Sequence, residues 1–175
     1  MHRSDPLQPL SRQHHIALVF AKTLRQWERL DPPPDPGEKR VVGEAAHRFW
    51  EVELVPHFRA EEEGLLGRWH RPGTDSLVTR VLQEHVGIHR VAQRLGRCLR
   101  QADIESAWEE ALRLGQCVNA HVRFEERHWL PELEAEMDAD LLAEAEHGIG
   151  HALDPEAAER ALPPRPDRER IGDEH

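Results

Sequence analysis

The feature that most constrains this chain is a motif that occurs twice and places histidine and glutamate four residues apart. The first copy, residues 57–63, reads HFRAEEE, and the second, residues 121–127, reads HVRFEER. Because an α-helix has about 3.6 residues per turn, side chains at this spacing project from the same side of the helix. Two such helices facing each other would bring imidazoles and carboxylates to a single point, which is most of a metal site.

The motifs lie in long segments with the apolar spacing of amphipathic helices. We expect helices at Ser11–Leu30, Glu38–His70, Ser76–Gln101 and Ile104–Met137. The helices should bend at Pro56 and Pro131. Asp31–Gly37, which reads DPPPDPG, is predicted to be non-helical because prolines remove backbone donors. Short connections between long helices, without alternating strand patterns, predict an all-α protein, an antiparallel up-and-down four-helix bundle.

The sequence also predicts how the chain divides. Residues 10–137 are expected to form the bundle, preceded by a loose arm at Met1–Leu10. Residues 138–162 are expected to form a C-terminal helical extension in two pieces, Ala139–Leu153 and Asp154–Leu162. Residues 163–175 have no apolar face and are expected to be a disordered tail.

Composition and charge limit the classes of partner. The formal net charge of −10, without a concentrated basic patch, argues against nucleic acid and against an anionic membrane. The apolar run Ile16–Ala21 is too short to span a bilayer, and it lacks the flanks of a signal peptide. Cys98 and Cys117 have no metal or redox spacing, so we read them as reduced thiols. A cytoplasmic protein is the resulting expectation, and the oligomeric state is left open.

The two remaining helices each add an inward histidine. On the third helix His85 lies on the apolar stripe. On the first helix the choice is between His14 and His15. Steps of one turn from His14 reach alanine and leucine, whereas the same steps from His15 reach Lys22 and Arg25. We therefore predict that His14 faces the core.

These residues form a set that is repeated in the two halves of the chain. The six inward candidates are His14, His57, Glu61, His85, His121 and Glu125. A single inward histidine is more often a hydrogen-bonded core residue, and a single HxxxE is usually a surface pair. The coincidence of all six favours a metal site, because buried groups of this kind are costly without a partner.

The donor types indicate which metals fit. Imidazole nitrogen with carboxylate oxygen suits iron, manganese or zinc. Six donors exceed the needs of one tetrahedral zinc ion, and two carboxylates can bridge a pair of ions. Two alternatives stay open, Glu126 in place of Glu125 and His89 as a further ligand. Glu62 and Glu63, next to Glu61, are expected on the solvated face.

The order and spacing of these stretches resemble the hemerythrin-like proteins of the HHE cation-binding family. The matching stretches are LSRQHH at 10–15, PHFRAEEE at 56–63, EHVGI at 84–88 and HVRFEER at 121–127. The resemblance implies a non-haem di-iron centre bridged by two carboxylates and an oxo or hydroxo group, with zinc or manganese as alternatives. It also implies that the centre binds O2, peroxide or nitric oxide. The ligand positions of the family fall on the six candidates, His14, His57, Glu61, His85, His121 and Glu125.

The chain departs from the pattern of the oxygen-carrying hemerythrins. Those carry HxxxH on the third helix and HxxxxD on the fourth. Here Glu125 follows its histidine at the fourth step, and His89 lies on the wrong side of His85 to reproduce the usual pair. The resulting six-ligand site is more symmetric and has fewer open positions, which disfavours simple oxygen carriage. Ferritin-like bundles use Glu-x-x-His, with the carboxylate first, and do not match.

Three functions are compatible with these residues. The first is a di-iron protein that binds or reacts with a small diatomic or peroxide ligand in sensing or stress defence. The second is a metal-binding or iron-sensing module without turnover. The third is a metal-free helical interaction domain. The sequence identifies no dedicated proton donor, substrate pocket or reductase partner, so whether the chain is an enzyme is left open.

Overall fold

The computed structural model describes residues 7–66, 75–136 and 155–167, and these are helical apart from short connections. The helices are α1 (Gln8–Glu28), α2 (Pro36–Phe49), α3 (Val55–Ala60), α4 (Asp75–Arg100), α5 (Ile104–Phe124), α6 (Leu130–Glu136) and α8 (Pro155–Ala161). Three π-helical segments join them: η2 (Trp50–Leu54), η3 (Glu61–Leu66) and η4 (Glu125–Trp129). The described ranges contain no β-strand, so the all-α prediction is confirmed for them.

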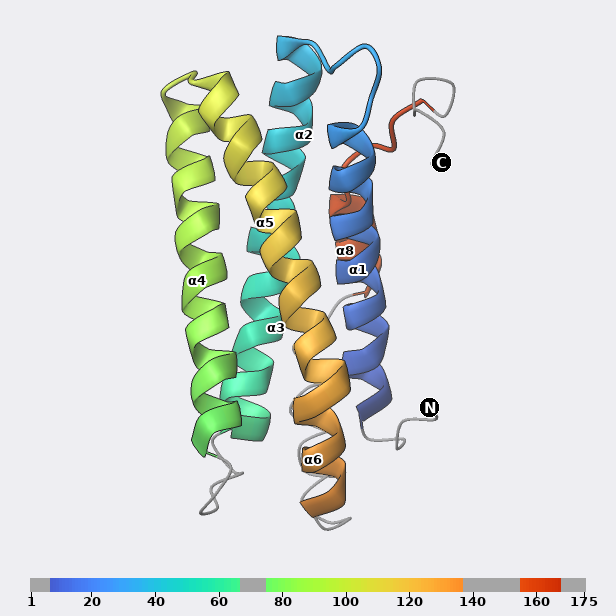
Figure 1. The fold of residues 1–175 in the computed structure, drawn as a ribbon, viewed down its shortest axis with the longest axis vertical. Coiled ribbons are helices and arrows are strands. Elements are labelled where there is room, and N and C mark those ends of the chain that lie inside the picture. The colour runs from blue at the N-terminus through green and yellow to red at the C-terminus, as the bar shows by residue number, and fades with distance from the viewer. Residues whose placement is uncertain (1–6, 67–74, 137–154, 168–175) are drawn as a thin grey trace.

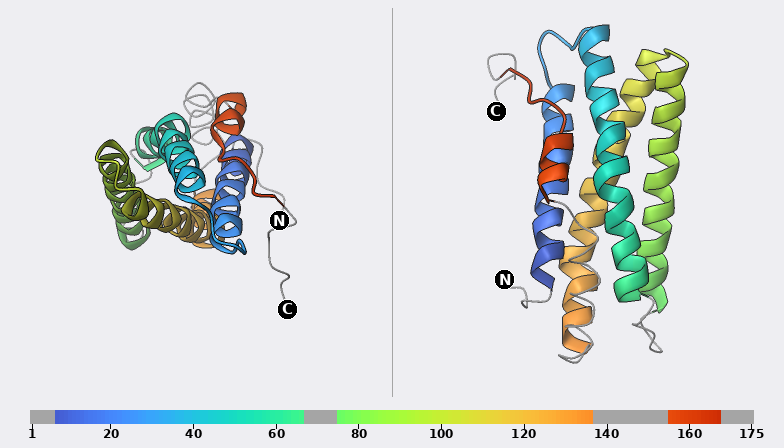
Figure 2. Two further views of the ribbon diagram at one scale, coloured as in Figure 1. Left: turned by 90° about the horizontal axis from the view of Figure 1, so that it is seen from above. Right: turned by 180° about the vertical axis from the view of Figure 1, so that it is seen from behind.

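The long helices lie side by side along the long axis of the molecule and form a helical bundle (Figure 1). Helix α5 packs against α1, α2 and α4, and α2 also packs against α4. Helix α8 lies on the outside of the bundle against α1 and α2, as the view from behind shows (Figure 2). This arrangement brings α1, α3, α4 and the end of α5 around one axis, where the repeated motifs meet.

Helix α1 begins earlier than the predicted Ser11, because the residues before Ser11 bury apolar side chains. Leu7 and Leu10 are completely buried, so the prediction of a loose arm is wrong for residues 7–10. Burying a leucine stabilises the fold by about 1.5–3 kcal/mol, which is enough to extend the helix. Ser11 is not the helix cap. Its hydroxyl instead donates a hydrogen bond of 3.2 Å to Glu126 Oε1.

Helix α2 also begins earlier than predicted, within the proline-rich connection. Pro36 and Gly37 occupy its first turn, where proline needs no backbone donor. Asp35 caps the helix, because its Oδ1 accepts the N–H of Glu38 at 2.8 Å. The Glu38 carboxylate accepts the N–H of Asp35 in return at 2.9 Å. The prediction that all of 31–37 is non-helical is therefore wrong for its last two residues.

Pro56 and Pro131 each follow a π-helical segment. The N–H of Val55, the residue before Pro56, donates to the carbonyl of Trp50, five residues back. The N–H before Pro131 donates in the same way to the carbonyl of Glu125. A widened turn of this kind accommodates a residue that lacks an N–H, and such turns are frequent at functional sites.

The C-terminal residues that the structure describes lie against the bundle. The indole N–H of Trp27 in α1 donates a hydrogen bond of 2.6 Å to the carbonyl of Pro164, beyond the end of α8. Ala161 is buried with the bundle core. The predicted helical piece at 139–153 lies outside the described residues. The predicted tail is described only over residues 163–167, and its disorder stays a prediction for 168–175.

The core consists of two apolar clusters with a polar layer between them. The large cluster includes Phe20, Phe49, Ile88 and Val118, and the small cluster includes Leu10, Val81, Phe124 and Trp129. On α4 and α5 a histidine, His85 or His121, lies between a residue of one cluster and a residue of the other. The same holds on α1 and α3, with His14 and His57. The polar layer is thus enclosed by apolar side chains at both ends.

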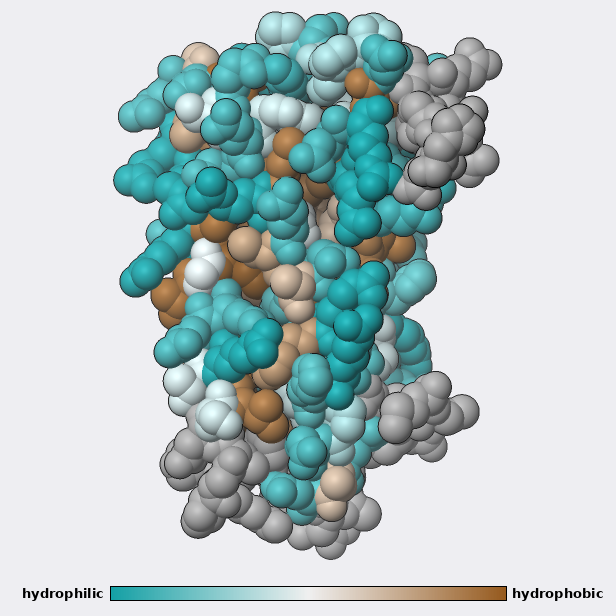
Figure 3. Space-filling view, viewed as in Figure 1, coloured by the Kyte–Doolittle hydropathy of each residue, from teal (hydrophilic) through white to brown (hydrophobic). Residues whose placement is uncertain are grey.

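Hydrophilic residues cover most of the face shown in Figure 3, with hydrophobic residues visible between the helices. Among the described residues, no helix combines the length and the apolar character needed to cross a membrane.

Candidate metal centre

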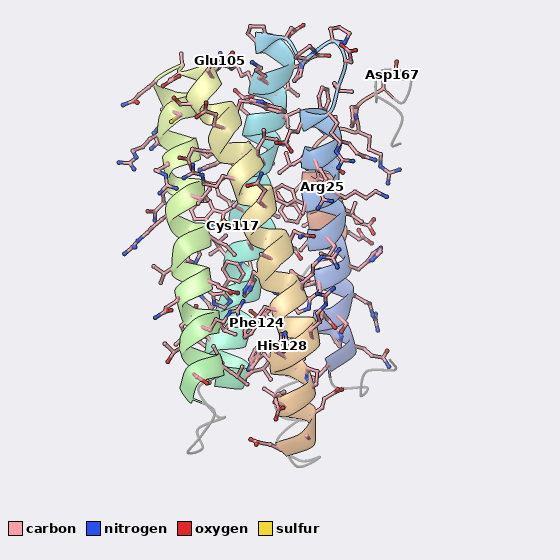
Figure 4. All side chains as sticks on the ribbon, in the orientation of Figure 1. Arg25, Glu105, Cys117, Phe124, His128 and Asp167 are labelled. Carbon is pink, nitrogen blue, oxygen red and sulfur yellow. The ribbon has the colours of Figure 1, made fainter. Side chains whose placement is uncertain are left out.

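The structure brings all six predicted residues together in the polar layer. The set comprises His14 from α1, His57 from α3, Glu61 from η3, His85 from α4, His121 from α5 and Glu125 from η4. The two glutamates are 0 % exposed and the four histidines are at most 3 % exposed. In Figure 4 the labels Cys117 and Phe124 on α5 mark the turns on either side of His121. A polar group this deeply buried needs a partner inside the protein.

Each motif presents its two side chains through one α-helical turn followed by a wider one. The N–H of Glu61 donates to the carbonyl of His57, and the N–H of Glu125 donates to the carbonyl of His121. This turn keeps the histidine and glutamate of each motif on the same side. In both copies the glutamate is the first residue of a π-helical segment. Sequence periodicity does not reveal this repeated irregularity.

The carboxylate of Glu61 faces two different groups of imidazoles. Its Oε1 lies 3.2 Å from His57 Nε2 and 3.6 Å from His14 Nε2. Its Oε2 lies 3.2 Å from His85 Nε2. The two oxygens of Glu61 therefore face imidazoles from different helices, His14 and His57 on one side and His85 on the other.

The carboxylate of Glu125 also faces two imidazoles of the polar layer. Its Oε2 is 3.1 Å from His14 Nε2 and 3.4 Å from His121 Nε2. Both glutamates therefore contact imidazoles from more than one helix. The layer links α1, α3, α4 and α5 through its side chains.

The inward donor atoms have no hydrogen-bond partner, although several lie close together. This is true of Nε2 of all four histidines and of both oxygens of Glu61 and Glu125. The contacts between them do not have hydrogen-bond geometry, so they leave the desolvation of these groups uncompensated. A cation at the centre would satisfy the nitrogens and the oxygens at once.

The donor atoms fall into two overlapping groups that are compact enough to hold a metal ion. One group is His14, His57, Glu61 and Glu125, and the other is Glu61, His85, His121 and Glu125. Within each group the donor atoms lie within 4.8 Å of one another. Each group offers two nitrogens and two carboxylates, a donor set that fits iron, manganese or zinc.

Comparison with known families agrees with this geometry. The family model of the hemerythrin HHE cation binding domain matches residues 5–133. The chain belongs to this family. Neither the curated proteins nor the solved structures gave a match to the chain. Membership confirms the predicted resemblance, and the buried histidine–glutamate groups give this hemerythrin-family chain the capacity to bind metal.

The hemerythrin-family site also has a layer of outer partners around the imidazoles. His14 Nδ1 lies 2.7 Å from Glu126 Oε1, and His85 Nδ1 lies 2.8 Å from Glu62 Oε1. His57 Nδ1 lies 2.9 Å from Gln13 Oε1, and His121 Nδ1 lies 3.0 Å from Glu84 Oε2. An acceptor at Nδ1 orients the ring and directs the Nε2 lone pair inward, as outer hydrogen bonds do in metal sites.

Sequence reasoning missed these outer partners. Glu62 is exposed as expected, but its carboxylate also contacts the ring of His85. Glu63 is exposed as expected, close to Arg59. A signal was present in the sequence, because a second glutamate follows the buried glutamate in both motifs. Periodicity alone could not show that its oxygen reaches the neighbouring helix.

The structure also places the residues that the sequence left as alternatives. His15 is exposed, whereas His14 is buried in the layer. Glu126 contacts the outer nitrogen of His14 and belongs to neither donor group. His89 accepts a hydrogen bond of 2.9 Å from the indole of Trp50. It too lies outside both donor groups.

The charges in the layer change the proton affinities of its members. Burial alone would lower the pKa of His14, but contacts with Glu125 and Glu126 outweigh burial and raise this pKa well above its usual range. Burial is likewise outweighed at His85, whose pKa is raised chiefly by Glu61. For Glu61 burial would raise the pKa, but the surrounding imidazoles lower it well below its usual range. Protons and metal ions therefore compete for the same nitrogens.

Proposed function

We propose that this hemerythrin-family chain is a non-haem di-iron protein that binds or reacts with O2, peroxide or nitric oxide in sensing or stress defence. The observation that carries the proposal is the set of inward nitrogens and oxygens that are buried without hydrogen-bond partners. Such atoms destabilise a fold unless a cation occupies the space between them. The proposed ligands are His14, His57, Glu61, His85, His121 and Glu125.

Two ions account for the arrangement better than one. The donor atoms form two groups that share Glu61 and Glu125, and the oxygens of Glu61 face different histidines. A single four-coordinate zinc ion would leave part of this set unused. The imidazole–carboxylate chemistry supports iron, with manganese and zinc as the alternatives to be measured.

The chain's own residues bind, orient and enclose the metal site. The four imidazoles offer Nε2, while their outer partners hold Nδ1 and fix the direction of each ring. Phe58 stacks on the His85 ring with centroids 4.0 Å apart and so limits its rotation. The two apolar clusters exclude water from both ends of the layer. Iron, when bound, would supply a redox-active centre able to take up a small ligand.

The helix arrangement is proposed to be the antiparallel up-and-down four-helix bundle that the sequence predicts. The successive columns are α1, α2 with α3, α4, and α5 with α6. The directions of the coloured ribbon in Figure 1 support this topology. It would carry one inward histidine on each column.

The reaction with small ligands tests this function directly. The full chain would be reduced without oxygen, mixed rapidly with O2, peroxide or nitric oxide, and followed by its optical spectrum. We expect a spectral change with at least one of these ligands, and no such change in chain stripped of metal. Iron-loaded protein whose spectrum responds to none of the three ligands contradicts the proposal.

The burial of the ligands favours one second candidate, a metal-binding or iron-sensing module without turnover. All six ligands are at most 3 % exposed, so bound metal would stabilise the bundle whether or not it reacted. The same rapid-mixing experiment separates the two functions. A sensing module would gain stability with iron and lose it with chelator, but would not change its spectrum with the small ligands.

A further inference from the structure

The outer partners of the four histidines follow the repeat of the chain. Glu126 and Glu62 follow the two motif glutamates, and each reaches a histidine of the opposite half. Gln13 and Glu84 each precede an inward histidine, and each reaches the motif histidine of its own half. The contacts are therefore related by the pseudo-twofold relation between the halves.

The repeat is broken in this outer layer at a single chemical group. The position that is a carboxylate at Glu84 is a neutral amide at Gln13. The two distances to the histidine Nδ1 are nearly the same, 3.0 Å and 2.9 Å. The two halves thus differ in the charge and the hydrogen-bonding capacity of this group, but not in its distance from the histidine.

A carboxylate and an amide act differently on an imidazole. A carboxylate can only accept, so Glu84 requires the proton of His121 to be on Nδ1 and leaves Nε2 free for a metal. An amide can turn and donate instead, so Gln13 does not fix the tautomer of His57. Within the part of the chain that the structure describes, the Gln13 amide nitrogen is buried without a hydrogen-bond partner, so no second hydrogen bond fixes the orientation of the amide.

The charges around the two donor groups differ accordingly. The His85–His121 group has two outer carboxylates, Glu62 and Glu84. Within the described residues, the outer hydrogen-bond partners of the His14–His57 group are one carboxylate, Glu126, and one amide, Gln13. Arg80 lies 2.8 Å from Glu84 Oε1 and offsets part of its charge, but Oε2 still contacts His121. Glu61 and Glu125 belong to both groups.

We propose that the two metal positions are inequivalent, and that the His85–His121 position binds its ion more tightly because Glu84 stands where the other half has Gln13. This rests on the proposed two-metal function. Loss of an outer carboxylate typically weakens metal binding by about 10–100-fold. The chain would therefore pass through a one-metal form with the ion at His85 and His121.

Stepwise metal binding to the full chain tests the proposal. Metal-free protein would be titrated with Fe²⁺ under anaerobic conditions against a competing chelator. We expect two dissociation constants that differ by about tenfold or more. Gln13→Glu should bring them together by tightening the weaker site. Glu84→Gln should bring them together by weakening the tighter site.

A charge swap and a matched control locate the effect. The double variant Gln13→Glu/Glu84→Gln should restore two separate constants with the positions exchanged. Anomalous diffraction from crystals with one Co²⁺ per chain would show this exchange directly. Glu63→Gln removes an exposed carboxylate that contacts no histidine, so it should leave both constants unchanged.

The outcomes separate the inference from the function on which it rests. Equal constants in the unmodified chain, or a ratio that ignores both single variants, would overturn the inequivalence and leave the two-metal function standing. Binding of no ion, or of a single ion at excess Fe²⁺, would overturn both. The buried acid that Gln13→Glu introduces can prevent folding. Glu84 is only partly buried, so Glu84→Gln tests the inference even in that case.

Discussion

At the scale of single residues, each histidine of the polar layer has a neighbour at both ring nitrogens. Nε2 faces the shared glutamates and Nδ1 meets an outer partner, which is a carboxylate for His14, His85 and His121 and an amide for His57. The cost of this arrangement is a set of buried polar atoms that the protein alone does not satisfy. Metal binding and ring orientation are therefore linked in the same side chains.

Removing a bridging carboxylate should release metal. Glu61→Ala or Glu125→Ala is expected to lose at least one ion per chain. Each should also lower the stability of the metal-loaded protein by about 3–5 kcal/mol, because buried partners are left unpaired. Metal analysis with urea unfolding measures both effects. Glu63→Ala, at an exposed position of the first motif, serves as the control, and an equal loss in that variant would contradict the assignment.

The adjacent histidines of α1 should respond differently to substitution. His14→Ala is expected to reduce metal content, because His14 Nε2 faces both glutamates. His15→Ala should change stability by no more than about 0.5 kcal/mol, since His15 is exposed. Metal content measured on the two variants decides the choice. Full retention of metal in His14→Ala would show that His14 is not a ligand.

At the scale of elements, close packing of α1 on α5 holds the first helix in place above the site. A Cβ added at Gly115 would lie 2.9 Å from Leu24 Cδ1 and 3.2 Å from Leu24 Cβ. Gly87 on α4 has open space, with no atom within 4 Å of an added Cβ. Alanine at Gly87 therefore tests helix propensity alone, whereas alanine at Gly115 also tests the packing of α1 on α5.

The same substitution at these glycines should have different effects. Gly87→Ala is expected to stabilise the protein by about 0.5–1 kcal/mol, because alanine loses less backbone entropy in a helix. The free energy of unfolding of Gly115→Ala should be about 1–3 kcal/mol lower than that of Gly87→Ala, since Leu24 must move to admit the added methyl group. Urea unfolding of both variants measures the difference. Equal stabilities would mean that α1 and α5 are not closely packed at this point.

The elements also show what the sequence could and could not predict. Apolar periodicity located the long helices, and the inward side of each identified His14 and His85. It could not find the π-helical segments, because a widened turn leaves no periodic signal over so few residues. It also missed Gln13 and Glu84 as outer partners, since their contacts depend on the spacing between helices and not on position along one helix.

At the scale of the whole molecule, the polar layer joins helices whose apolar clusters lie on either side of it. In the metal-free protein, contacts with carboxylates favour the protonated forms of His14 and His85. The pKa of His14 and that of His85 are raised, so their contribution to the metal-free fold is complete below the ordinary imidazole pKa of about 6.5. That contribution is lost as the pH rises through the raised values.

Metal binding has the opposite dependence on pH, because it needs the imidazoles without their protons. The gap in Tm between metal-loaded and chelator-treated protein should therefore widen from about pH 6 to about pH 8. Thermal unfolding of both forms across this range measures it. A gap that stays constant, or narrows with rising pH, would contradict the competition between protons and metal.

The most direct test of the two-metal centre is the metal content of the aerobically purified full chain, measured by mass spectrometry with an optical spectrum of the same sample. The proposed function predicts two iron ions per chain, one for each donor group, with near-ultraviolet absorption that changes on reduction. Stoichiometric zinc, or protein without metal whose stability is unchanged by chelator, would contradict it.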